Sequence, residues 1–390
     1  MVTETNAVPG RARVAVTVAF TAHGLVAAAW VARIPQIKEH LGLGEGAMGV
    51  ALLGAPVGVV AAVQLAGRTV ARWGSRATTV AAGLAAALSL VPLGLAWNLP
   101  ALVAALLLMG GSLGLMDVAM NAQGVAVERG YGRPLMSGLH GAYSVGTLLS
   151  ALAGAAAAHA GVPVPLHLTA AALLLCVLVL AGCRGLLDPS ADAVPEPDGG
   201  RARPALSSSR WPLAMLGVIG LCSFVGEGAM ADWSAVYLRE DLGTGPGAAG
   251  LGYAGCAVAM TAGRLGGDRV VARFGPVPVL RAGSLVAAAG LGLGLAAGHP
   301  AAAVAGFTLF GLGAAVVAPV TFSAAGNLPG VPAAAGISRV TAVGYAGLLG
   351  GPPVIGFVAQ GVGLAWALAV PVALVGLIVL LAPAAAAAEG

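Results

Sequence analysis

The chain has 390 residues, of which 58% are hydrophobic and only 9% are charged. A soluble domain carries about 25% charged residues because its surface must face water, so this composition excludes a single soluble globular domain. The formal net charge of +4 is spread over many short segments, which speaks against a nucleic-acid-binding domain and for a membrane protein.

A membrane-spanning helix needs about 20 mainly apolar residues. Breaks at charges and at Pro/Gly clusters predict six spans in the first half of the chain, at 13–33, 46–66, 77–97, 100–126, 135–158 and 163–182. Six more are predicted at 211–233, 246–266, 277–297, 300–325, 335–359 and 364–383. The predicted fold class is therefore an all-α membrane protein with about twelve transmembrane helices.

Residues 183–210 separate the two sets of spans. This segment is polar and Pro-rich, and it contains Asp188, Glu196 and Arg203. Such a composition is typical of a flexible linker. We therefore predict an N-terminal six-helix half at 1–182, a linker at 183–210 and a C-terminal six-helix half at 211–390.

The distribution of basic residues predicts the orientation. With both termini in the cytoplasm, only Arg33, Lys38 and Arg239 fall outside. The other basic residues then face the cytoplasm: Arg11, Arg13, Arg68, Arg72, Arg76, Arg129, Arg133, Arg184, Arg201, Arg203, Arg210, Arg264, Arg269, Arg273, Arg281 and Arg339. This asymmetry follows the positive-inside rule and predicts a multi-pass cell-membrane protein with cytoplasmic termini and a cytoplasmic linker.

The two halves are related by a constant offset of 201 residues. Residues 68–74, Arg-Thr-Val-Ala-Arg-Trp-Gly, match residues 269–275, Arg-Val-Val-Ala-Arg-Phe-Gly. The same offset relates 38–42 to 239–243, and Ser137 to Ser338. Parallel six-helix repeats with a midplane site between them are typical of major facilitator transporters.

The segment Gly67-Arg68-Thr-Val-Ala71-Arg72-Trp-Gly74-Ser-Arg76 follows the second predicted span. It resembles the cytoplasmic loop signature of the major facilitator superfamily, Gly-x-x-x-Asp-Arg-x-Gly-x-Arg. The resemblance implies a carrier whose loop charges hold the cytoplasmic gate closed. The gate candidates are Gly67, Arg68, Arg72, Gly74 and Arg76, with Asp268, Arg269 and Arg273 in the second repeat. Ala71 replaces the acidic residue of the signature, which allows a weakened or rewired clamp around Asp268.

The fourth predicted span carries Asp117-Val-Ala119-Met-Asn121 after a Gly-rich stretch. This pattern is similar to the fucose-permease-like branch of the superfamily, in which the fourth-helix carboxylate is the proton-linked group. The resemblance therefore implies that role for Asp117. The sugar symporters of that branch also have a first-helix carboxylate before a Pro-Gln pair, where this sequence has Val31.

Ionisable residues within spans are costly and are therefore functional candidates. Asp117 and Asn121 lie four residues apart on one helical face, which allows a proton carrier or a purely structural hydrogen bond. Glu227 lies in the seventh span between two glycines. It is a candidate for substrate or proton handling, and the alternative is a hydrogen bond that holds a gate. His23 and His140 are candidate proton relays or helix-packing hydrogen bonders.

Further polar groups lie on spans that border a cavity in this architecture. Tyr143, Asn327 and Tyr345 are candidates for orienting a substrate. The run of Gly110, Gly111 and Gly114 lacks a following lysine, so helix packing explains it better than a phosphate loop does.

The sequence therefore predicts a secondary active transporter, proton-coupled and working by alternating access, for a small and sugar-like solute. The alternative is a proton-driven efflux carrier for drug-like or amphipathic compounds. No motif resembles a nucleotide-binding site or a metal site, so we expect neither an enzyme nor a cofactor. The expected partners are a small-molecule substrate, protons and the lipid bilayer, with the chain as a monomer.

Overall fold

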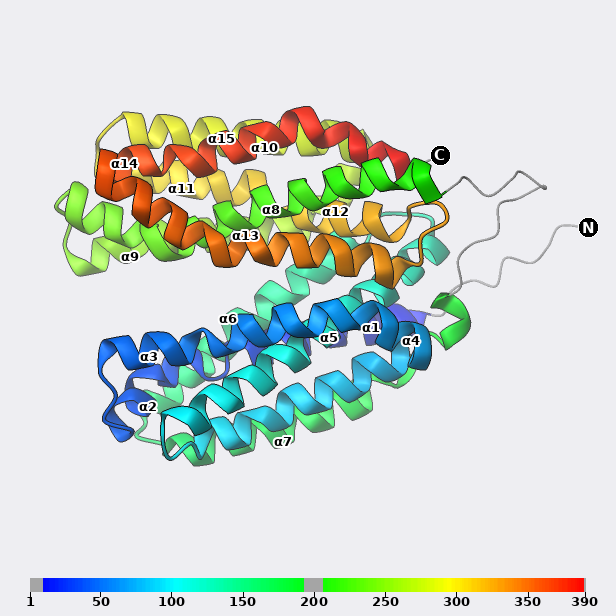
Figure 1. Cartoon of the computed structure of the whole chain (residues 1–390), viewed down its shortest axis with the longest axis horizontal. Coiled ribbons are helices and arrows are strands. Elements are labelled where there is room, and N and C mark those ends of the chain that lie inside the picture. Colours follow the sequence, from blue (N-terminus) through cyan, green and yellow to red (C-terminus); the bar gives the residue numbers. More distant parts are fainter. Residues whose placement is uncertain (1–9, 193–205, 389–390) are drawn as a thin grey trace, which may run out of the picture. The chain divides into compact units, whose positions relative to one another are not determined.

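The computed structural model describes residues 10–192 and 206–388 of the chain (Figure 1). Within these ranges every regular element is a helix. Ten of the described helical stretches are long and apolar enough to cross a membrane. One of them, Val50–Gly94, covers most of two predicted spans, 46–66 and 77–97, and the 29-residue helix α9 (Pro246–Phe274) contains the predicted span 246–266. The helices are thus consistent with the predicted twelve spans.

The described residues divide into two compact units, and each unit includes one short segment from the other half of the sequence. Unit 1 comprises the described part of Met1–Arg133, Ala142–Ala193 and Pro332–Ser338. Unit 2 comprises Pro134–Gly141, the described part of Val194–Val331, and that of Arg339–Gly390. The exchanged segments lie at the starts of α6 (Met136–His159) and α13 (Ala333–Val362).

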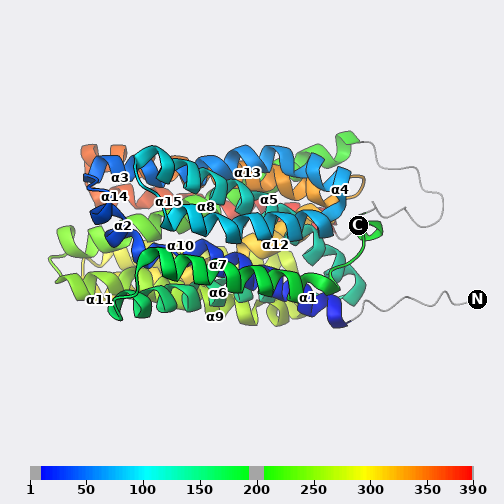
Figure 2. The same cartoon turned by 90° about the horizontal axis from the view of Figure 1, so that it is seen from below.

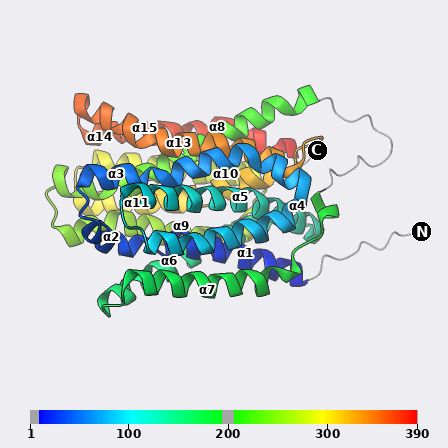
Figure 3. The same ribbon diagram turned by 60° about the horizontal axis from the view of Figure 1, so that its bottom comes forward.

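Unit 1 is built from long helices whose apolar faces pack on one another. Its elements are α1 (Gly10–Ala28), η1 (Val31–Arg33), α2 (Ile34–His40), α3 (Glu45–Leu52), α4 (Gly54–Gly94), α5 (Leu99–Tyr131), most of α6, α7 (Val164–Gly182), η2 (Cys183–Gly185) and η3 (Pro189–Asp192). Helix α4 packs against α5 and α7, and α1 packs against α7 and α5 (Figures 2 and 3). A core that includes Trp30, Leu90, Leu106 and Leu168 fills one end of this unit.

Unit 2 follows the same plan. Its elements are α8 (Leu206–Val236), η4 (Tyr237–Asp241), α9, α10 (Pro276–Ala296), α11 (Pro300–Ala314), α12 (Val317–Gly326), most of α13, α14 (Leu364–Ala367), α15 (Ala369–Leu381) and η5 (Ala382–Ala388). Helix α11 packs against α10 and α9, and α15 packs against α10 and α8. The buried rings of Tyr237 and Phe307 meet edge to face, 6.3 Å apart, within this unit.

The backbone confirms the 201-residue repeat. Gly42 and Gly243 end corresponding turns with φ values of 60° and 66°, and Gly74 and Gly275 both have a φ of 80°. A residue with a Cβ atom rarely adopts a positive φ, so glycine is favoured at each of these positions in both repeats. At Gly74 the kink divides the continuous helix α4 into the second and third predicted spans.

Close helix packing explains the Gly-rich run of the fourth span. A Cβ added at Gly110 would overlap the backbone carbonyl of Ala55 on α4. One repeat further on, a Cβ at Gly311 would overlap the carbonyl of Cys256 on α9. The neighbouring backbone occupies the space at both positions, so Gly110 and Gly311 allow close packing of their helices.

Only the ends of the expected linker lie in the described part of the chain. Residues 193–205, including Glu196, Arg201 and Arg203, lie outside the described residues. Before this gap the chain forms the short turns η2 and η3, and after it α8 begins at Leu206.

Candidate functional site

Asp117 and Asn121 form a buried polar pair on α5. Asp117 is 8% exposed and Asn121 is fully buried. The Asn121 amide nitrogen donates to Asp117 Oδ1 at 3.1 Å and to the Asp117 carbonyl at 2.8 Å. The four-residue spacing on one helical face predicts this pairing, and the structure shows it. No lysine or arginine among the described residues forms an ion pair with Asp117.

His23 of α1 lies against the same helix, one turn before Asp117. Its Nε2 is 3.1 Å from the carbonyl oxygen of Leu113, and its Nδ1 is buried without a hydrogen-bond partner in the described chain. The ring of Tyr143 on α6 lies 5.4 Å from the His23 ring. Three of the predicted candidates, His23, Asp117 and Tyr143, therefore belong to unit 1 and are arranged around α5.

Glu227 of α8 is part of a second polar group, in unit 2. Its Oε2 is 3.2 Å from Nη2 of Arg264 on α9, and its Oε1 accepts from Ser223 Oγ at 3.2 Å. Arg264 also donates from Nε to the Ala315 carbonyl at 3.3 Å. The Glu227 carboxylate thus has a cationic partner, whereas the Asp117 carboxylate has an uncharged amide.

Arg264 is part of the predicted span 246–266 rather than of the loop that follows it. Its side chain is 8% exposed, and it lies inside α9 with its charge directed at Glu227. By the positive-inside rule Arg264 counts as a cytoplasm-facing residue, and that rule does not predict its pairing with Glu227. Its distance from the end of the helix, together with the intramembrane Glu227, was the available signal for an ion pair.

The remaining predicted candidates make local contacts. His140 stacks on Phe322 with ring centroids 5.6 Å apart, and Tyr345 meets Phe224 edge to face at the same distance. Asn327 follows the end of α12, and its side chain donates to the Ser323 carbonyl at 2.9 Å. These contacts belong to unit 2, whereas Asp117 belongs to unit 1.

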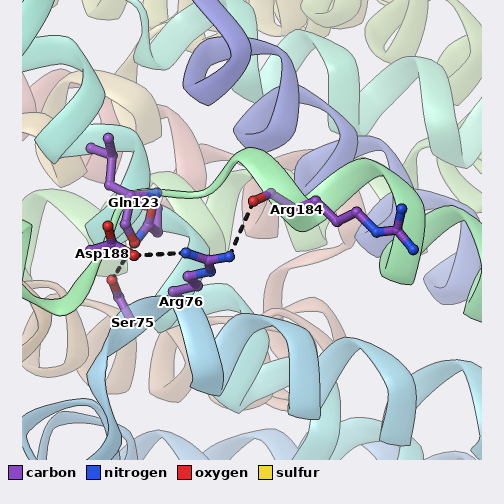
Figure 4. Close-up of polar contacts among 6 residues, drawn as sticks. Ser75, Arg76, Gln123, Arg184 and Asp188 are labelled. Carbon is purple, nitrogen blue, oxygen red and sulfur yellow. Dashed lines mark hydrogen bonds and ion pairs between the residues drawn. The ribbon is translucent and has the colours of Figure 1, made fainter. Parts of the chain in front are cut away.

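In the first copy of the loop signature, Arg76 forms an ion pair and a hydrogen bond to a backbone carbonyl. Its Nη1 donates to Asp188 Oδ1 at 2.7 Å and its Nη2 to the Arg184 carbonyl at 3.2 Å (Figure 4). Beside it, Gln123 of α5 bonds to Ser75 and to both backbone polar groups of Leu187. Sequence reasoning missed Gln123 because a single amide near a helix end carries no distinctive pattern.

The other basic residues of the two loops are exposed. Arg72 and Arg273 lie 5.9 and 5.4 Å from the rings of their own neighbours, Trp73 and Phe274. Arg68 and Arg269 are exposed as well. Arg76, by contrast, contacts a backbone carbonyl, that of Arg184.

Asp268 caps the start of α6 within unit 2. Its Oδ1 accepts from the Ser137 backbone N–H at 2.8 Å, and its Oδ2 accepts from that of Gly138 at 2.9 Å. A carboxylate at a helix N-terminus stabilises the unpaired amides there. The Ser137 hydroxyl adds a bond to the Arg264 carbonyl at 2.7 Å.

The corresponding contact in unit 1 has a serine, Ser338, at the position of Ser137, but it has no acidic residue at the position of Asp268. Ser338 Oγ donates to the Val63 carbonyl at 2.6 Å, which corresponds residue for residue to Ser137 and Arg264. Gly67 stands where the second copy has Asp268, and Ala335 lies close beside it. The clamp is thus asymmetric, with a carboxylate in one repeat only.

A family model described as Major Facilitator Superfamily matches residues 15–269. An uncharacterized MFS-type transporter of Yersinia pestis is 40% identical over 349 residues, which are 89% of each chain. Two solved structures of FucP match in fold. The first, in the outward conformation, has a TM-score of 0.78 and 18% identity, and covers 94% of this chain and 97% of that one.

The second is a variant of the E. coli fucose:proton symporter FucP, with a TM-score of 0.73, 16% identity and the same coverage. At these identities the likeness to FucP is one of fold. The match of the family model to more than half of the chain and the Yersinia pestis relative together carry the assignment: the chain belongs to the major facilitator superfamily and is a multi-pass membrane transporter, not an enzyme.

Proposed function

We propose that the chain is a secondary active transporter that moves a small solute by alternating access and couples this movement to protons at Asp117. The observation that carries the proposal is the environment of Asp117. This carboxyl group is buried within a membrane helix, and its hydrogen-bond partner is the Asn121 amide. A charged carboxylate without a cationic partner is costly there, so proton binding and release are expected to accompany the transport cycle.

Glu227 has a different proposed role. Its ion pair with Arg264 stabilises the charged form, so Glu227 is suited to holding Arg264 in place or to contacting a polar substrate. His23, one turn from Asp117, is suited to relaying a proton because an imidazole can both accept and donate one.

The proposed substrate is a small, sugar-like solute. The fold likeness to FucP, which is a fucose:proton symporter, supports both the proposed sugar-like substrate and the proposed proton coupling of this chain. Val31 favours the alternative, a proton-driven efflux carrier for drug-like or amphipathic compounds. It stands where the sugar symporters of the resembling branch have a carboxylate, and its side chain is 47% exposed.

The proposed orientation places both termini and the segment 183–210 in the cytoplasm of a cell-membrane protein that works as a monomer. The excess of basic residues near those segments supports it, even when Arg264, which is paired with Glu227 within unit 2, is left out of the count. In this orientation the Asp268 cap on α6 and the Arg76 contacts lie at the cytoplasmic ends of their helices, where they contribute to an inner gate.

Flux through proteoliposomes tests this function. A thermal-shift screen of sugars, amino acids and amphipathic drugs first identifies a ligand, because a ligand that binds the folded state raises its stability. Uptake of that ligand is then measured with and without an inward proton gradient. We expect accumulation that depends on the gradient and is abolished by a protonophore. A ligand that binds but equilibrates at the same rate with and without a gradient would contradict proton coupling.

A further inference from the structure

Unit 1 contains a pocket of about 400 Å³ that is separate from the group around Asp117. It lies where α2 meets the end of α4 and the connection between α6 and α7. Most of the lining residues are apolar, among them Ile37, Leu93 and Ala158, and the polar side chains of the lining are Arg33, Gln36 and His40. The few polar groups therefore decide which ligand fits.

Arg33 is the main polar feature of this pocket. Its side chain is 2% exposed, and its Nη2 donates to the Val162 carbonyl. Its Nε and Nη1 are buried without a hydrogen-bond partner among the described residues, and no described carboxylate pairs with it. A buried guanidinium without a counter-charge is costly, because it has lost its hydration and gained no ion pair.

A buried guanidinium without a counter-charge favours an anionic ligand, and two neighbouring features of the pocket add to this preference. Helix α7 begins at the pocket with Val164 and Pro165, and its N-cap residue Pro163 provides no side-chain acceptor. The positive end of the α7 dipole therefore favours negative charge at the same place as Arg33. Gln36 also lines the pocket, and its buried Oε1 lacks a donor in the described chain.

Arg33 is not a requirement of the repeated fold. The 201-residue offset relates it to Ser234, which is fully buried and bonds to the Met230 carbonyl of its own helix. The second repeat thus builds the same helix junction without a buried cation. The charge at Arg33 therefore calls for an explanation specific to the first repeat.

We propose that this pocket binds an oxyanion that also carries a hydroxyl group. The phosphate or carboxylate oxygens accept from the two unpaired guanidinium nitrogens of Arg33. The hydroxyl donates to Gln36 Oε1, and the carbon skeleton packs on Ile37 and Leu93. A polyol phosphate has this chemistry, either as a free solute or as the headgroup of an anionic phospholipid.

The test measures binding to the full-length protein purified in a neutral detergent. Glycerol 3-phosphate is the soluble probe and phosphatidylglycerol is the lipid probe, with glycerol and phosphatidylcholine as uncharged and zwitterionic controls. Binding is measured as the rise in thermal midpoint with probe concentration, and retained lipid is counted by native mass spectrometry. Because transport is not measured, failure here would leave the proposed function standing.

Three variants separate the pocket from general charge effects. Arg33→Gln is expected to weaken binding of the anionic probe by about 10- to 100-fold, because it removes charge-assisted hydrogen bonds. Ala158→Phe keeps Arg33 but fills the pocket, and should abolish binding. Arg239→Gln removes an exposed charge of the second repeat and should bind like the wild type.

Stabilisation by glycerol 3-phosphate would identify a solute site, and stabilisation by phosphatidylglycerol alone a lipid-headgroup site. Either result supports the proposal if the variants behave as expected. Wild-type protein that responds to neither anionic probe, or binding that Arg33→Gln leaves unchanged, would overturn it. If Arg33→Gln does not fold, the test rests on Ala158→Phe. Binding of the anionic probe that Ala158→Phe leaves intact would then overturn the proposal.

Discussion

At the scale of single residues, Gln123 connects three parts of unit 1. Its amide nitrogen donates to Ser75 Oγ at 2.6 Å and to the Leu187 carbonyl at 3.0 Å, and its oxygen accepts from the Leu187 N–H at 2.8 Å. Gln123 thereby fixes the chain beyond α7 onto α4 and α5 (Figure 4). Its side chain is fully buried, so water cannot replace these bonds.

Gln123→Leu is therefore expected to destabilise the protein. It leaves the backbone polar groups of Leu187 without their partner, at a cost of about 1–3 kcal/mol for each buried group. Thermal and denaturant unfolding in detergent measure the loss. Gln64→Leu, at an exposed position of α4, is the matched control and should change little. Equal stabilities for the two variants would show that the Gln123 bonds contribute nothing.

The Glu227–Arg264 ion pair lends itself to a double-mutant cycle. Glu227→Gln and Arg264→Gln each leave one charge with its partner removed, whereas the double variant removes both. We expect the double variant to be more stable than the sum of the single effects, with a coupling energy of about 0.5–3 kcal/mol. Unfolding free energies of the four proteins measure the coupling. Additive effects would mean that the 3.2 Å contact is energetically silent.

Sequence reasoning at this scale succeeded where a pattern was local. The pairing of Asp117 with Asn121 follows from a four-residue spacing along one helix. It failed where partners are distant in the chain. The burial of Arg33 and the contact of Arg264 with Glu227, 37 residues away, depend on how helices pack, which hydropathy does not encode.

At the scale of elements, the start of α6 is held by a carboxylate from α9. Asp268 accepts from two successive backbone amides, and Gly138 allows the approach, since a Cβ there would crowd the carboxylate oxygen. At the corresponding start of α13 the sequence has Gly67 in place of the acid, and Ser338 donates to the Val63 carbonyl. The starts of α6 and α13 are therefore expected to differ in how readily they detach from their neighbours.

Asp268→Ala should loosen the segment Pro134–Gly141 from α9. Loss of a capping side chain costs about 0.5–2 kcal/mol, which corresponds to about a 2- to 30-fold larger detached population. The measurement is the thiol-labelling rate of Leu139→Cys, which is 4% exposed, in a background without the native cysteines. Asp232→Ala, which removes an exposed carboxylate of α8, is the control. An unchanged labelling rate in the Asp268 variant would exclude a role for the cap.

The elements themselves were largely predictable, because spans of about 20 apolar residues are encoded locally. Their ends were not. The second and third predicted spans form one continuous helix with a kink at Gly74, and within the first predicted span α1 ends at Ala28, before the short turn η1. Where a helix ends depends on backbone geometry and capping, which a hydropathy pattern does not encode.

At the scale of the whole molecule, the proposed orientation predicts which sites are accessible from each side of the membrane. Ser190→Cys, at an exposed position beyond α7, should react with an impermeant thiol reagent only from the cytoplasm. Glu240→Cys, exposed in η4, should react only from the outside. Labelling of intact cells and of inverted vesicles measures both. Reaction of Ser190→Cys in intact cells would reverse the orientation derived from the basic residues.

The most direct test of the account is the transport behaviour of Asp117→Asn in proteoliposomes. Asparagine keeps the size of the side chain and resembles the protonated carboxyl group, but it cannot release a proton. With a substrate found by the binding screen, the variant should retain counterflow exchange and lose accumulation driven by an imposed pH gradient. Asp232→Asn, at an exposed carboxylate of α8, should keep both activities. Full gradient-driven accumulation by Asp117→Asn would contradict the central claim that the coupled proton is carried by Asp117.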